Sequence, residues 1–211
     1  PEMGLGFVGK IIVATSLQAV LFSVIAVWLL GKWQLDNSAE PLDFNAATWV
    51  KAFLVLAVLH IFLYFTCGYY IAWQSVELRE FYGGGTADGF FSQMMYLLEN
   101  DPWLFPFQFL RGLIWALVAS LLAVMLQGTR ISAALISASV VVALFSLMLA
   151  LPNPLMPEAV RHAHLIETVI SRGLFAFIAV WILHSMLQLQ RDEANQQTKL
   201  LADDGREYQP K

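Results

Sequence analysis

Ionisable side chains gather in residues 156–172, immediately before an apolar run over residues 173–183. Charged groups that enter a helix of membrane-spanning length are costly to insert, and they are typical of functional sites. The segment is therefore the natural place to look for chemistry. Its ionisable members are Arg161, His162, His164, Glu167 and Arg172.

Helical spacing predicts which of these side chains can act together. At ~100° of rotation per residue, a sector of roughly 140° holds the polar members of one face. These are His164, Glu167, Thr168, Ser171 and Arg172. They are expected to line one cavity. His162 points away from His164, by about 200°, so this pair cannot chelate one metal from a regular helix.

Two chemistries are open to His164 and Glu167. Their nitrogen and oxygen ligands suit zinc or another transition metal, although no HExxH motif occurs. Alternatively, His164 is a general base and Glu167 its orienting acid in an intramembrane enzyme that acts on a lipid headgroup. The sequence does not decide whether the chain is an enzyme, and it favours a protein without catalysis.

A haem site is a further alternative, with His60 and His184 as axial ligands in apolar surroundings. Their unequal depths in antiparallel helices, a mismatch of roughly 9 Å, argue against it. Cys67 lies among aromatic residues without an adjacent cation, which predicts an inert thiol. No bound cofactor is the expectation.

The composition defines the class of protein. The chain has 211 residues, of which 58% are hydrophobic and 13% charged, and its mean hydropathy is +0.63. These values and the long apolar blocks predict an all-α integral membrane protein. The net charge of −4 and the lack of a dense Lys/Arg cluster argue against nucleic acid as a partner.

The apolar blocks predict a bundle of five transmembrane helices that forms a single domain over residues 1–191. An apolar run of about 20 residues crosses a bilayer of ~30 Å. The first run is too long for a signal peptide and is interpreted as a retained helix. A polar tail, solvated and partly disordered, is expected at 192–211. The predicted helices cover about 7–30, 49–76, 107–126, 131–151 and 157–190.

One further helix is expected between the second and third crossings. Residues 90–99 are rich in Phe, Met and Leu but too few to span, and they come after the glycine-rich segment 83–89. This pattern predicts an interfacial or re-entrant helix. In the fourth crossing, Ala134 with Ala138, and Ser139 with Ala143, have the spacing that lets membrane helices approach closely.

The parity of five crossings predicts the remaining members of the site. The start of the first helix, the end of the second and the starts of the third and fifth lie at one membrane face. This places Lys10, Gln74, Glu77 and Arg111 in the leaflet of His164, Glu167, Ser171 and Arg172. The distribution of Lys and Arg favours a cytoplasmic C-terminus in a cell (inner) membrane.

The sequence thus predicts a polar, net-positive cavity in one leaflet that binds or moves a small ion, a proton or an anionic amphiphile. In the structural alternative, Glu167 pairs with Arg172 or Arg111 to hold helices together, and Arg161 extends to the headgroups. A third possibility is an accessory subunit of a larger membrane complex. The expected partners are the lipid bilayer, an anionic lipid or small ligand, and further copies or subunits.

Overall fold

The computed structural model describes residues 45–207 except 84, 86–88, 127, 153 and 154, together with isolated helical positions near the N-terminus. Side chains of residues 194, 195, 197–199 and 201–207 are not described. The chain divides into two units, Pro1–Leu42 and Asp43–Lys211, and the helices α2 to α7 belong to the second. The described residues of this second unit form helices and no strands.

Helix α2 covers Ala46–Cys67 and continues as a π-helical turn, η1, over Gly68–Ala72. The Asn45 side chain caps its start by accepting a hydrogen bond from the Thr48 amide. The prediction that this helix runs on through residue 76 is wrong. The helix ends at a turn, where Gln74 Nε2 donates to the Tyr69 carbonyl at 2.9 Å. Arg79 donates to the Trp73 carbonyl at 2.7 Å.

A short helix, α3, covers Val76–Phe81 after this turn. Ser75 is its N-cap: the Ser75 hydroxyl accepts from the Leu78 amide and donates to Glu77 at 2.9 Å. The backbone amide of Glu77 and the Ser75 hydroxyl lower the pKa of the Glu77 carboxyl. Glu77 is therefore a capping residue of α3.

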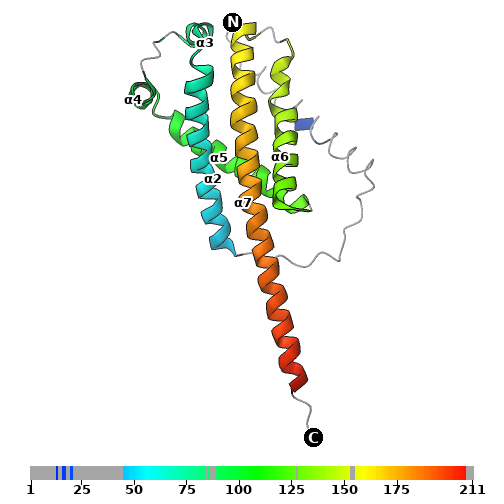
Figure 1. Ribbon diagram of the computed structural model, residues 1–211. Helices are drawn as coiled ribbons and strands as arrows, with labels where there is room; N and C mark the ends of the chain where they lie inside the picture. Colours follow the sequence, from blue (N-terminus) through cyan, green and yellow to red (C-terminus); the bar gives the residue numbers. More distant parts are fainter. Residues whose placement is uncertain are drawn as a thin grey trace. The chain divides into compact units, whose positions relative to one another are not determined.

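Helix α4 covers Phe90–Asn100 and begins after Gly89, whose φ of 128° favours glycine. It is seen end-on in Figure 1, whereas α2 runs in the plane of the picture, so α4 lies across the direction of α2. None of its residues is fully buried, and Phe91 is 82% exposed. This placement fits the interfacial alternative; a re-entrant path is not shown.

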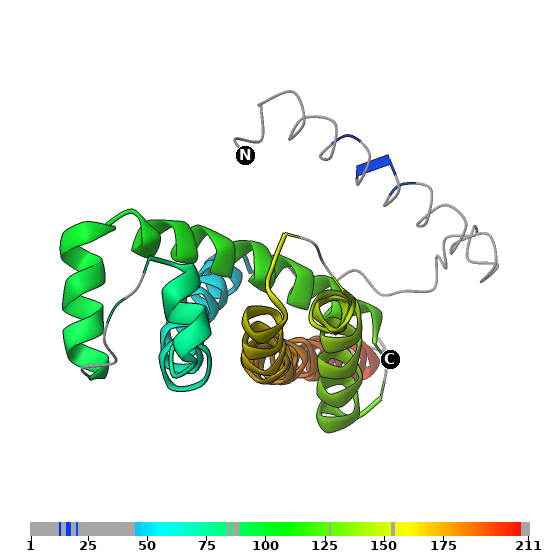
Figure 2. The ribbon, with the colours of Figure 1, turned by 90° about the horizontal axis from the view of Figure 1, so that it is seen from above.

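Helix α5 covers Leu104–Met125 and crosses α2 and α7 obliquely (Figures 1 and 2). Gly112 permits the crossing. A Cβ at this position would lie 2.9 Å from Ala57 Cα and 3.0 Å from His60 Cβ, so any larger residue would push α5 away from α2. Gly112 therefore determines where the polar face of α5 meets α2.

Helix α6 covers Arg130–Phe145 and ends in a 3-10 turn, η2, at Leu147–Ala150. It packs along α7, which covers Glu158–Glu207. The face of α6 that contains Ala133, Ala134 and Ser137 is buried, whereas Ser139 and Ala143 are not. Ala134, of the predicted pair Ala134 and Ala138, therefore packs against other helices of this chain.

The C-terminal half of α7 extends beyond α2 and α6 (Figure 1). Because α7 continues to Glu207, the segment after Arg191 is helical, where a partly disordered tail was expected. The long helix is uninterrupted because residues 158–207 contain no proline, and their two glycines, Gly173 and Gly205, are far apart.

Four described helices are long and apolar enough to cross a membrane, which defines an integral membrane protein. The predicted first crossing at 7–30 lies outside the described residues apart from isolated positions, so the count of five and the single domain over 1–191 stay predictions. The four candidate spans are Ala46–Ala72, Leu104–Met125, Arg130–Ala150 and Glu158–Glu193.

Candidate binding cavity

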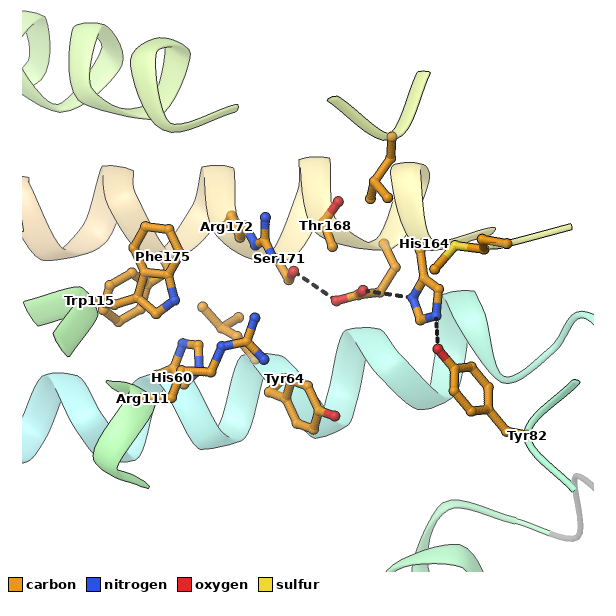
Figure 3. Close-up of a pocket in the computed structure, with 14 residues that line it drawn as sticks. His60, Tyr64, Tyr82, Arg111, Trp115, His164, Thr168, Ser171, Arg172 and Phe175 are labelled. Carbon is orange, nitrogen blue, oxygen red and sulfur yellow. Dashed lines mark hydrogen bonds and ion pairs between the residues drawn. The ribbon is translucent and has the colours of Figure 1, made fainter. Parts of the chain in front are cut away.

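A cavity of about 380 Å³ lies between α2, α5 and α7, and we call it the arginine cavity. Figure 3 shows its polar side chains around one space. Apolar side chains, among them Leu63, Met156 and Phe175, complete the wall. The polar and aromatic lining residues are His60, Tyr64, Tyr82, Arg111, Trp115, His164, Glu167, Thr168, Ser171 and Arg172.

The cavity extends from Tyr82 and Met156, which lie outside the candidate spans, to the apolar middle of α2. His60 is close to the middle of the span Ala46–Ala72, ~20 Å from either end at 1.5 Å per residue. Gly112 packs directly on His60, so Arg111 is held at the same level. From the sequence, Arg111 is expected roughly one turn inside its helix. The packing of Gly112 on Ala57 and His60 instead brings it opposite the centre of α2.

Arg111 has no hydrogen bond or ion pair with any residue that the structure describes. Its guanidinium lies between α2 and α7, beside His60 and Tyr64 (Figure 3). The side chain is half-buried. A guanidinium keeps its charge and carries five N–H donors, so Arg111 presents unused donors to the cavity.

Arg172 contributes a second cation, which α6 and α5 hold in place. Its Nη1 donates to the Phe145 carbonyl at the end of α6. Its Cζ lies over the Trp115 ring, 5.7 Å from the centroid, in a cation–π contact. These contacts orient one edge of the guanidinium and stiffen this side of the cavity.

A connected series of polar contacts crosses the wall of the cavity (Figure 3). The Ser171 hydroxyl donates to Glu167 Oε1 at 2.9 Å, and Glu167 Oε2 lies 3.7 Å from His164 Nδ1. His164 Nε2 is 3.0 Å from the Tyr82 hydroxyl. Both carboxylate oxygens of Glu167 therefore have a neighbour within the wall.

Burial raises the pKa of the Tyr82 hydroxyl, which therefore keeps its proton at neutral pH. Tyr82 and His164 Nε2 share one hydrogen bond, and which of them donates depends on the tautomer of His164. His164 Nε2 faces Tyr82, and His164 Nδ1 faces Glu167. Both ring nitrogens of His164 thus have a neighbour in the wall, and the lipid-headgroup enzyme stays a prediction.

No ion pair joins Glu167 to Arg111 or Arg172 among the described residues. Arg172 is near enough to Arg111 and to Glu167 to interact with each electrostatically. Two arginines face one carboxylate, so the arginine cavity is net positive when its histidines are neutral. The pairing that the structural alternative requires is not formed.

The structure places the other predicted members of the site elsewhere. Gln74 is engaged at the end of η1 and Glu77 at the start of α3, and neither lines the arginine cavity. Both lie near the end of the bundle where α7 begins, but their polar groups serve the local backbone (Figure 1). Lys10 lies outside the described residues.

Arg161 does not extend to the headgroups. Its side chain is 6% exposed, and its Nη1 donates to the carbonyls of Leu149 and Ala150 at 2.8 and 2.9 Å. These carbonyls have lost their helical partners where η2 ends, so the guanidinium caps them. His162 is exposed and lies 3.9 Å from Glu158.

His164 and Glu167 lie together, but the described residues contain no group of three or more His, Cys, Asp or Glu side chains that could hold a metal ion. The pair alone leaves a zinc ion short of protein ligands. The haem pair is separated: His60 lines the arginine cavity, whereas the buried His184 does not. These side chains therefore fit neither a zinc ion nor a haem.

Sequence reasoning missed several lining residues. Trp115 lies four residues after Arg111, and Phe175 four after Ser171, so helical spacing could have added them. Tyr82 has no such signal, because the turn after α3 brings it to His164 from 82 residues away. Its place depends on the tertiary structure alone.

No protein-family model, curated protein or solved structure matches this chain. The geometry of the arginine cavity is therefore the basis on which a function can be assigned.

Proposed function

We propose that this membrane protein binds an anionic group in the arginine cavity. The observation that carries the proposal is Arg111, a half-buried cation that lies opposite the middle of the span Ala46–Ala72 and has no partner among the described residues. A charge at this depth is costly unless a counter-charge accompanies it. An anionic ligand supplies that counter-charge.

The chemistry of the wall favours an anion over a cation. The oxygens of Glu167 face Ser171 and His164, whereas the N–H donors of Arg111 point into open space. His60 is 8% exposed and lines the same cavity. A planar guanidinium favours carboxylate and phosphate, which accept two parallel hydrogen bonds.

The proposed setting is a cell (inner) membrane with the C-terminal end of α7 in the cytoplasm, as the Lys and Arg distribution favours. In this setting the ligand reaches Arg111 from the membrane face where α2 ends and α7 begins.

The test is binding of methyl phosphate to the full chain in nanodiscs of phosphatidylcholine, followed by phosphorus NMR. Arg111→Met removes the unpartnered charge but keeps a long unbranched side chain, and it should weaken binding by at least about tenfold. Glu77→Gln is the matched control, because Glu77 lies outside the cavity and its replacement should leave binding unchanged.

Two results would overturn the proposal. One is an Arg111→Met protein that unfolds normally on heating and binds methyl phosphate as the wild type does. The other is equal binding of methylammonium and methyl phosphate by the wild type, since a net-positive cavity must discriminate against the cation.

A further inference from the structure

A second and larger cavity, of about 700 Å³, adjoins the first, and we call it the aromatic cavity. It lies between the end of α2, η1, α4, the start of α5 and α7. Helix α4 supplies Met94 and Leu97, although it buries none of its residues completely. Other apolar lining residues are Phe65, Tyr69, Trp73 and Leu104.

The two cavities share part of their lining. Tyr64, Tyr82, His164 and Glu167 border both. The polar contacts from Glu167 through His164 to Tyr82 therefore lie at the junction. Both arginines line only the first cavity, whereas the second is lined mainly by apolar and aromatic side chains, with Ser92, Gln93 and Asp101 among them. A ligand that occupies both spaces must have a charged end and an apolar end.

We propose that the ligand is an anionic amphiphile whose headgroup lies in the arginine cavity and whose apolar chain lies in the aromatic cavity. This inference rests on the proposed function and adds the class of ligand. Both volumes fall within the ~300–1,000 Å³ of typical ligand pockets. One apolar chain, packed against Phe65, Met94 and Leu97, is the occupant that the lining favours.

Gly68 offers a way to block the chain without disturbing the headgroup. It lines the aromatic cavity but not the arginine cavity. A Cβ at Gly68 would meet nothing within 4 Å, and its φ of −56° is accessible to every residue type. Gly68→Leu should therefore fold and fill part of the aromatic cavity, and Gly68→Ala should fill much less.

The experiment compares methyl phosphate with dodecyl phosphate, using the full chain in phosphatidylcholine nanodiscs and subtracting partition into empty nanodiscs. The wild type should bind dodecyl phosphate at least about tenfold more tightly than methyl phosphate. Gly68→Leu should weaken dodecyl phosphate binding by about tenfold and leave methyl phosphate binding unchanged. Gly68→Ala should resemble the wild type for both.

The variants separate failure of this inference from failure of the proposed function. Should Gly68→Leu bind dodecyl phosphate as the wild type does, or lose both ligands equally, the aromatic cavity does not hold the chain. Equal affinity of the wild type for both ligands would mean a free anion, or a headgroup alone, as the ligand. If Arg111→Met binds both ligands normally, the proposed function itself fails.

Discussion

The contact between α6 and α7 at Arg161, Leu149 and Ala150, which we call the seam, and the arginine cavity each contain an arginine from an apolar helix. The two arginines differ in their partners. In the seam, Arg161 donates to two carbonyls where η2 ends, and little of its side chain is exposed. In the cavity, Arg111 faces open space and has no partner among the described residues. Arg172 is intermediate, with one carbonyl and one aromatic ring.

The difference shows when a buried arginine stabilises the fold. The last carbonyls of a helix have no amide partners, and a guanidinium that donates to them stabilises both the carbonyls and its own buried charge. Arg111 lies opposite the centre of α2 and donates to no helix-end carbonyl among the described residues. The lack of a capping partner is what supports the ligand-binding role that we propose for Arg111.

The largest expected effect on stability comes from a substitution in the seam. Arg161→Met should lower the free energy of unfolding by about 2–4 kcal/mol, because the carbonyls of Leu149 and Ala150 lose hydrogen bonds to a charged group. The only cysteine, Cys67, is buried, so a fluorogenic thiol dye can report thermal unfolding in detergent. Methyl phosphate binding should survive wherever the variant is folded.

A smaller effect, of opposite direction, is expected in the cavity. Arg111→Met should leave the free energy of unfolding unchanged or raise it by up to about 1 kcal/mol, because it removes a desolvated charge that no described residue pairs with. The same dye measurement checks it. A loss as large as that of Arg161→Met would mean that Arg111 is structural, and the contrast between the two regions would fail.

The smallest effect concerns Glu77, which helix parity assigned to the site. Its pKa is lowered in the folded state, so its contribution to stability is present above the unfolded value of 4.5 and is lost as pH falls below it. Between about pH 6 and about pH 3.5, the wild-type melting temperature should fall slightly more than that of Glu77→Gln. Identical pH profiles for the wild type and Glu77→Gln would show that Glu77 does not cap α3.

The helices were largely predictable, because apolar blocks of membrane-spanning length have few alternatives in a bilayer. The break in the helix after α2 was not predictable. Residues 73–75 contain no proline or glycine, and the turn depends on Ser75, Gln74 and Arg79 satisfying the freed carbonyls and amides. Such side-chain to backbone bonds compete with helix continuation in a way that hydropathy does not reveal.

The polar face of α7 was also predictable, since helical periodicity alone places Glu167, Ser171 and Arg172 together. Their partners were harder to assign. Parity places residues at a membrane face, but it does not distinguish a cavity from a helix end, and so it grouped Gln74 and Glu77 with Arg111. Depth along the membrane depends on helix tilt, which packing at Gly112 determines.

The sequence by itself determined the class of protein and the polar stripe on α7, because composition and periodicity are local properties. The tertiary structure decided which arginine caps a helix and which faces a cavity. It also brought Tyr82 to His164 and joined the arginine cavity to the aromatic cavity. The physical reason is that a charged side chain has no fixed role: the groups that packing brings within reach decide whether it is satisfied.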